Sequence, residues 1–432
     1  MQKATFPMKS SFSFMTGNVL VLTVCRVIFT LSQSLAWPYF SLFVLALGGS
    51  VKEIGLITAL GGLAGLIFFP VGGYVADKKG RVKLVGFSTF MYAFSYLFFA
   101  LAWRWEILAL GQFTQQLVLF YMPAMNAIMA DSLPAKQRGI GFATTMAIPG
   151  AIGIVIPYVG GYLIDKVYGG DIIPAMRLSY SISLILGLAV ALIRLKFLRE
   201  TLNSDEEAIT IRNFPRLLRE SYLSVWETLK WLPRTLRSIA AIEMITIFFV
   251  NLAAPYWIVY AKQVIGLTAY EWGVIMLLTG AFNIALSIPI GHLIDRYGPR
   301  RMILATSPIA PIATLLFTFS NTFTQLLAVL MFLTIFNTVA WPAYSTLMVN
   351  QIPLDRRGRV FSILGQGVNV SAGGVPMGAL LLFIPGTAGS LLGGYIYDHN
   401  QNYPWYILAT ALTACFLLIV KYIKEPERPQ QQ

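Results

Sequence analysis

The stretch Gly72–Val85 reads GGYVADKKGRVKLV and carries one acid and four bases. Apolar segments without any charge, Ile54–Val75 and Leu84–Ala102, run into it from both sides. Each is close to the ~20 residues that an α-helix needs to cross a bilayer. A second copy, IGHLIDRYGPRRMI at Ile290–Ile303, again precedes an apolar segment. The sequence therefore predicts two copies of a charged turn, each between helices that cross a membrane.

The composition extends this prediction to the whole chain. Apolar residues make up 56% of the 432 residues and charged residues 12%, whereas soluble domains carry about 25% charged residues. An outer-membrane barrel would instead show alternating segments of ~10 residues. We therefore predict an all-α polytopic membrane protein. The twelve expected helices span residues 17–46, 53–76, 82–103, 105–130, 140–164, 174–198, 238–261, 270–294, 300–320, 322–349, 359–384 and 403–424.

The net charge of +13 is unevenly distributed along the chain. Most Lys and Arg residues fall in the termini and in the loops that would share their side of the membrane. The loops on the other side contain Lys52, Arg104, Lys166, Arg177 and Lys262. Because positive loops stay in the cytoplasm, we expect a protein of the cell (cytoplasmic) membrane with both termini cytoplasmic. The basic charge then reflects orientation, and no nucleic-acid partner is expected.

Few residues could hold a metal ion or a cofactor. Cys25 and Cys415 fall inside predicted helices, and His292 and His399 lie near helix ends. No His/Cys metal site follows from these positions, and no phosphate-binding P-loop is present. We expect no metal, no cofactor and no disulfide framework.

The chain is an internal duplication. LAWPYFSLF at Leu35–Phe43 matches LAAPYWIVY at Leu252–Tyr260, and Met122–Phe142 matches Trp341–Phe361 at nearly the same offset. This predicts two pseudo-symmetric six-helix bundles, residues 1–198 and 238–432. The linker 199–237 between them contains an amphipathic segment expected to lie as a helix on the cytoplasmic surface.

A shorter repeated segment, which we call the Gly-Gly-aromatic echo, occurs within each half. GGYVAD, GGYLID (Gly160–Asp165), GHLID and GGYIYD (Gly393–Asp398) each end or follow a predicted helix. Such an echo indicates inverted three-helix repeats nested in the six-helix repeats, although it is also a common way to end a helix. Residues Pro385 and Gly386 are expected to break the eleventh helix near the outer surface.

These features resemble the major facilitator superfamily of secondary transporters over essentially the whole chain. The family motif Gly-x-x-x-Asp-(Arg/Lys)-x-Gly-Arg is similar to the two charged turns, in which Pro299 displaces the second arginine. The matching residues are Gly73, Asp77, Lys78, Gly80 and Arg81 in the first copy, and Gly291, Asp295, Arg296, Gly298 and Arg300 in the second.

The resemblance implies that Asp77 and its neighbours close the cytoplasmic side and release as the two halves rock. Asp77 could pair with Arg81. Alternatively, the motif has no gating role: its basic residues only keep the loop on the cytoplasmic side, and its glycines only allow helices to pack closely. Asp131 and Arg138 also resemble a family pattern and predict a second gating pair, in the first half alone because Asn350 replaces the acid in the second.

Two charges are expected inside the membrane. Arg26 lies about 12 Å into the first helix, and Glu243, at the corresponding position of the second half, lies about 9 Å into the seventh. The resemblance places the first, fourth, seventh and tenth helices around a central cavity, with these residues on opposite walls. They could bind substrate or a proton. Alternatively, Arg26 reaches toward the interface or ties helices together.

Uncharged polar residues follow the same expected cavity faces. Arg26, Thr30, Gln33 and Trp37 form one stripe at helical spacing. Their predicted partners on the other helices are Gln112, Gln115, Gln116, Asn126, Asn251, Tyr256, Asn337 and Gln366. Each could instead make an ordinary hydrogen bond between helices.

These observations favour a transporter over an enzyme, because no nucleophile with its base is expected at membrane depth. A membrane-embedded enzyme and a channel or receptor remain the rivals. Pro157, Gly160 and Gly161 partly match a motif of the family's antiporters. With an aromatic-rich cavity, this favours proton-coupled efflux of an amphipathic small molecule by a monomer. An organic-anion carrier that uses Arg26 is the alternative.

Overall fold

The computed structural model describes residues 14–76, 80–134, 137–202, 214–349, 351–352, 360, 363–364 and 380–423. All regular secondary structure within these ranges is helical. Eleven helical segments in this part of the chain are long and apolar enough to cross a membrane. The prediction of an all-α polytopic membrane protein is confirmed.

Each half opens with the same three elements, of 20, 3 and 7 residues. They are α1 (Gly17–Ala36), η1 (Trp37–Tyr39) and α2 (Phe40–Ala46) in the first half, and α11 (Arg234–Ala253), η6 (Ala254–Tyr256) and α12 (Trp257–Gln263) in the second. Pro38 and Pro255 sit in the two tight turns, because proline cannot donate the hydrogen bond of a continuous helix. The duplication therefore extends to the backbone.

The remaining helices of the first half also match the predicted segments. They are α3 (Val51–Ala76), α4 (Arg81–Ala100), α5 (Trp105–Val118), η2 (Leu119–Tyr121), α6 (Met122–Ser132), α7 (Arg138–Gly153), α8 (Ile156–Tyr162), η4 (Leu163–Val167) and α9 (Ile172–Phe197). The amphipathic segment forms α10 (Phe214–Trp231), whose Tyr222 hydroxyl donates to the Leu66 carbonyl of α3 at 2.7 Å.

The second half continues with α13 (Ala269–Tyr297), α14 (Pro299–Thr306), α15 (Ile309–Thr318), α16 (Phe323–Val349), α18 (Leu380–His399) and α19 (Tyr403–Tyr422). The glycines that precede α4 and α14 share a positive φ but differ in ψ, which is 27° at Gly80 and 149° at Gly298. Gly80 before α4 and Gly298 before α14 have φ of 92° and 87°, values that glycine adopts without the clash of a Cβ atom.

The eleventh helix differs from the prediction. Residues 365–379 lie outside the described residues, but α18 runs unbroken through Pro385 to His399. A proline removes one backbone hydrogen bond, yet dense packing holds the helix together. Gly389 and Gly393 of α18 lie directly against the backbone of Phe248 and Leu252 in α11. The expected break at Pro385 was wrong because this packing outweighs the lost bond.

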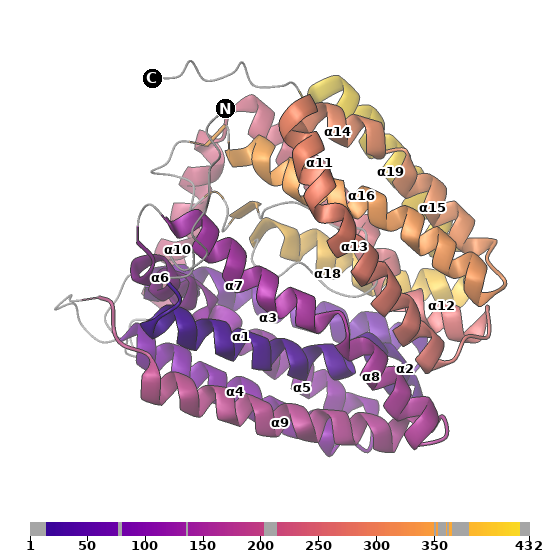
Figure 1. The fold of residues 1–432 in the computed structure, drawn as a ribbon, viewed down its shortest axis with the longest axis horizontal. Coiled ribbons are helices and arrows are strands. Elements are labelled where there is room, and N and C mark those ends of the chain that lie inside the picture. Colours follow the sequence, from indigo (N-terminus) through magenta and orange to yellow (C-terminus); the bar gives the residue numbers. More distant parts are fainter. Residues whose placement is uncertain are drawn as a thin grey trace, which may run out of the picture.

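The two halves meet at one end of the molecule (Figure 1). There α2 contacts α12, α8 contacts α13, and α3 contacts α18. From this closed end the halves diverge toward the end at which α1 begins, α19 ends and α10 lies, which we call the terminal end (Figure 1).

Candidate binding cavity

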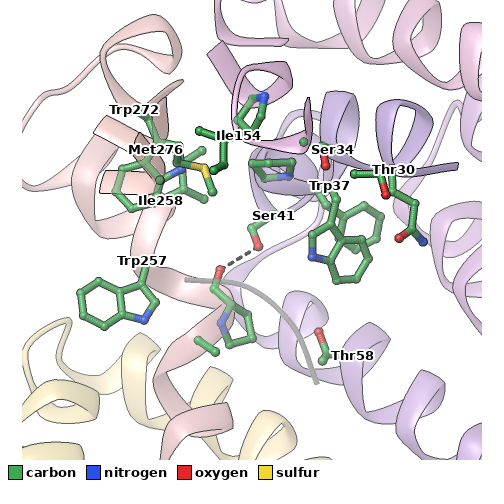
Figure 2. Close-up of a pocket in the computed structure, with 18 of the residues that line it drawn as sticks. Thr30, Ser34, Trp37, Ser41, Thr58, Ile154, Trp257, Ile258, Trp272 and Met276 are labelled. Carbon is green, nitrogen blue, oxygen red and sulfur yellow. Dashed lines mark hydrogen bonds between the residues drawn. The ribbon is translucent and has the colours of Figure 1, made fainter. Parts of the chain in front are cut away.

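A cavity of about 700 Å³ lies between the two halves, within the size range of small-molecule sites. Helices of both halves contribute side chains, which Figure 2 shows converging from opposite sides. Many of the residues predicted from the polar stripes line it. They are Thr30, Gln33, Trp37, Gln112, Gln115, Gln116, Asn251 and Asn337.

Other predicted residues lie elsewhere. The cavity lining does not include Arg26, Asn126, Glu243 or Tyr256, and Gln366 lies outside the described residues. Glu243 instead borders a separate pocket, Tyr256 is fully buried, and Asn126 is exposed. Sequence reasoning also missed lining residues of the second half, among them Trp272, Met276 and Asn283 of α13.

The lining combines aromatic rings with amides and hydroxyls. Trp37 stacks on Phe40 with ring centroids 5.7 Å apart. Gln33 Nε2 donates to the Tyr92 hydroxyl at 2.5 Å. Ser41 Oγ donates to the Pro255 carbonyl of the other half at 2.7 Å, as Figure 2 shows. None of the residues that line the cavity in the described part of the chain is charged.

Two glutamines of α5 have unused hydrogen-bonding atoms. Gln112 is 4% exposed and Gln115 is 6% exposed. Within the described ranges, Gln112 Oε1 and Gln115 Nε2 have no hydrogen-bond partner. Gly61 of α3 lies against the side chain of Gln112, so the small residue leaves room for this amide. An unpartnered buried amide group costs about 1–3 kcal/mol, so a hydrogen-bond partner for either atom would lower the free energy of the protein.

Arg26 points into the first bundle, close to a second arginine that the sequence did not reveal. Arg194 of α9 is 2% exposed and lies within electrostatic range of Arg26. Its Nη1 donates to Thr89 Oγ1 at 2.6 Å, and its guanidinium lies 5.6 Å from the ring centre of Tyr121. Arg194 falls inside the predicted helix 174–198, but the sequence prediction counted only Arg26 and Glu243 as charges inside the membrane.

Glu243 lies in a separate pocket of about 30 Å³ inside the second bundle, roughly the volume of one water molecule. The side chain is 2% exposed, and in the described part of the chain neither carboxyl oxygen has a hydrogen-bond partner. Around it lie Thr246, Tyr344 and Cys415 with several apolar residues. A charged carboxylate is disfavoured in such surroundings.

Two tyrosines occupy equivalent positions at the closed end. Tyr39 donates to the Pro157 carbonyl at 2.5 Å, and its hydroxyl also lies against Gly273 of the other half. Tyr256 donates to the Val51 carbonyl of the other half at 3.2 Å, and its hydroxyl lies against Gly55. Both side chains are fully buried, so each fills a junction between the two halves.

The repeated Gly-Gly-aromatic segments end at the same junctions. Asp165 accepts a hydrogen bond from the Tyr270 amide in the first turn of α13. Asp398 pairs with Lys52 Nζ at 2.8 Å, in the first turn of α3. Each acid therefore lies at the start of a helix in the opposite half, where a negative charge is favourable.

At the terminal end, Arg81 is buried and pairs with Asp131 at 2.6 Å. Arg138 instead donates to the Ala130 carbonyl at 3.1 Å, so the expected Asp131–Arg138 pair does not form, because α7 turns Arg138 onto the backbone of α6. The second copy differs, since Arg300 donates to the Ile423 carbonyl at 2.6 Å. Asp295 and Arg296 are exposed. Of the remaining gate residues, Gly73 and Gly291 lie within α3 and α13, and Asp77 and Lys78 lie outside the described residues.

We expect Asp131→Ala to destabilise the protein by about 1–3 kcal/mol, because it removes the carboxylate that accepts a hydrogen bond from the buried Arg81 guanidinium. The measurement is the thermal midpoint of the purified protein in detergent. Glu106→Ala is the matched control, since it breaks an exposed pair with Arg104 and such pairs contribute at most about 1 kcal/mol. Equal midpoints for the two variants would contradict the prediction.

Two related helical bundles around a shared cavity, joined at one end and spread at the other, define a membrane transport protein. The sequence model of the Major Facilitator Superfamily matches residues 22–376 and 239–432. The chain belongs to the Major Facilitator Superfamily and is a multi-pass membrane protein and a secondary transporter.

The chain is similar to multidrug resistance proteins named MdtG. That of Enterobacter lignolyticus (strain SCF1) is 27% identical over 342 residues, 76% of this chain and 77% of the relative. That of Citrobacter koseri (strain ATCC BAA-895 / CDC 4225-83 / SGSC4696) is 26% identical over 389 residues, 85% of this chain and 90% of the relative.

Solved structures share the fold at low sequence identity. The nucleoside transporter NupG superposes with a TM-score of 0.66 at 13% identity, over 94% of this chain and 98% of that one. A bacterial homologue of the iron transporter ferroportin, in an inward-facing state, gives 0.68 at 14% identity, over 94% and 98% of the two chains.

Proposed function

We propose that the protein exports amphipathic small molecules from the cell in exchange for protons. The observation that carries this proposal is the cavity between the halves, in which Trp37 and Trp272 lie beside a few amides. Aromatic and thioether surfaces can repack around varied ligands. The similarity to multidrug resistance proteins supports the direction of transport.

The charge of the loops supports an orientation with both termini in the cytoplasm, in a bacterial inner membrane. In this orientation the closed end faces outward and the cavity opens toward the cytoplasm, the state that loads an exported compound. Residues 1–198 and 238–432 then rock as two bundles, joined by the linker 199–237. We propose that a single chain suffices for transport, because the cavity is formed within it.

Glu243 is the proposed proton carrier. Its carboxyl group is buried in the second bundle without a partner among the described residues, and an ionisable group at membrane depth is a functional candidate by default. The proton site and the drug cavity are separate, so the proton acts through the conformation of the bundle. The rival proposal, an organic-anion carrier, loses support because the residues that line the cavity do not include Arg26.

Transport assays in inside-out vesicles test the proposal. We expect an imposed proton gradient, acidic inside, to drive uptake of a fluorescent amphipathic dye at least about tenfold above vesicles that lack the protein. A protonophore should abolish the gain. Uptake that is insensitive to the protonophore would remove the proton from the mechanism. Dye that moves only in right-side-out vesicles would reverse the proposed direction.

A further inference from the structure

We infer that the cavity selects uncharged ligands that carry an amide-like group, with a hydrogen-bond donor beside an acceptor. This inference rests on the proposed function and names the substrate class of the same site. The first argument is charge, because no Asp, Glu, Lys, Arg or His lines the cavity among the described residues. A cation or anion that entered would lose water without gaining a counter-ion, which is strongly unfavourable.

The segment from Val360 to Ile384, which the structure describes only in part, does not alter this argument. Its sequence contains no ionisable Asp, Glu, Lys, Arg or His. The buried charges of the protein also lie apart from the cavity. Arg194 contacts Thr89 and Tyr121 in the first bundle, and Glu243 occupies its own pocket in the second.

The second argument is the pair of free amide atoms on α5. Gln112 offers an acceptor, Oε1, and Gln115 offers a donor, Nε2. Residues three apart on a helix lie on one face, about 5–6 Å apart at Cβ. A ligand amide presents an N–H and a C=O side by side and can therefore satisfy both side chains.

A competing explanation would be an internal partner. Both glutamines also border a gap of about 10 Å³ beside Tyr96 and Tyr180. A gap of this size is at the lower limit for one water molecule, so nothing larger can enter from that side. The neighbouring Gln33 is already engaged with the Tyr92 hydroxyl. Gln112 and Gln115 thus border both spaces, and of the two only the cavity is large enough to hold a ligand.

The apolar body of the ligand follows from the rest of the lining. Trp37 and Phe40 stack as a pair on one wall, and Trp272 and Met276 line the cavity from the other half. The ring of Trp257 points away from Trp37 (Figure 2) and packs against Phe317 and Trp405. A flat aromatic group can be enclosed between these walls while its amide reaches α5. The ligand class is thus an uncharged aromatic amide, lactam or ureide.

Three nearly isosteric probes test the inference: N-benzylbenzamide, benzyl benzoate and N-benzylbenzamidinium. The ester lacks the N–H donor, and the amidinium is a cation of the same shape. Purified full-length protein in detergent is titrated with tritiated N-benzylbenzamide, and the other two compounds compete. We expect the ester to bind about tenfold more weakly, the effect of one neutral hydrogen bond, and the amidinium about a hundredfold more weakly.

Variants assign the effect to the glutamines. Gln112→Leu should remove the preference for the amide over the ester, because it removes the acceptor for the ligand N–H, whereas Gln115→Leu should weaken both compounds equally, because both carry the C=O. Gln112→Glu should reverse the charge preference and admit the amidinium, because it places an acid where the ligand donor lies. Gln263→Leu is the control, since Gln263 is exposed at the end of α12, outside the cavity lining.

The outcomes separate this inference from the proposed function. An amidinium that binds the unchanged protein as tightly as the amide would overturn the selection for uncharged ligands. An ester that binds as tightly as the amide would overturn the donor–acceptor pair. The expected binding pattern without export in vesicles would leave the ligand class standing and remove efflux. Dye export without any amide binding would leave efflux standing and remove the proposed ligand class.

Discussion

Transport by the Gly55→Ala variant is expected to fall at least about tenfold, because the two halves can no longer meet at the closed end. A Cβ atom at Gly55 would overlap the backbone oxygen of Ser390 and lie 2.8 Å from the Tyr256 hydroxyl, both in the opposite half. Neither backbone nor buried tyrosine can yield without separating α3 from α18. The clash exists only in the conformation that is closed at this end, so the variant should favour the alternative conformation.

The measurement is a distance distribution between spin labels at Val167 and Val264, which are exposed residues on opposite halves near the closed end. We expect a longer distance in Gly55→Ala and in Gly161→Ala, whose added Cβ would meet Ala269 of the other half. Gly86→Ala is the matched control. Its Cβ would meet only Leu195 within the same half. An unchanged distance in both test variants would refute the assignment of these glycines to the gate.

Local sequence was sufficient to predict the course of the helices and their duplication. The matching stretches around Pro38 and Pro255 revealed the duplication, but the tight turns η1 and η6 were not predicted, because a proline can also stand inside a continuous helix, as Pro385 does. The stripe that contains Thr30, Gln33 and Trp37 was also readable, because polar residues at helical spacing inside an apolar segment must face other protein.

Helix rotation was harder to predict. In a membrane, lipid tails are as apolar as a helix interface, so an apolar pattern does not reveal which side of a helix faces its neighbours. Arg26 and Glu243 were placed at membrane depth, but the sequence could not show that they turn away from the cavity. Arg194 was missed because its burial depends on Thr89 and Tyr121, which come from distant helices.

The closed-end contacts were predictable only in part. The Gly-Gly-aromatic echo was visible in the sequence, but the partner across each glycine is a property of the tertiary fold. Gly161 approaches Ala269, and Gly394 approaches Val51, the two residues at the start of α13 and α3. The echo therefore marks equivalent junctions between the halves, in addition to helix ends.

Glu243→Gln is expected to abolish concentrative transport while leaving ligand binding and exchange intact. The neutral amide has nearly the shape of the protonated acid, and it cannot release a proton. In the present conformation both carboxyl oxygens lie in a pocket for about one water molecule, and no residue that the structure describes bonds to them. This pocket favours the protonated acid, because burial of an unpaired carboxylate is costly. Release of the proton must then wait until the bundle rearranges and water reaches the acid.

Two assays separate coupling from folding. A proton gradient should no longer concentrate the dye in vesicles that contain Glu243→Gln, with a loss of at least about tenfold. Counterflow, in which labelled ligand exchanges with unlabelled ligand at equal pH, should stay within about twofold of the unchanged protein. A simple packing defect would reduce both rates together. Glu243→Asp should retain part of the concentrative transport, because a proton-binding group remains.

The surroundings of Glu243 supply the control that decides the assignment. Tyr344 of α16 and Cys415 of α19 are the other ionisable side chains of the pocket. Because neither changes charge readily at neutral pH, Tyr344→Phe and Cys415→Ser should preserve proton-driven uptake. Uptake that persists in Glu243→Gln and disappears in Tyr344→Phe would place proton binding elsewhere in the pocket. Uptake that persists in all three variants would move the coupling site out of the second bundle, leaving Glu243 as a buried acid that the fold tolerates in its neutral form.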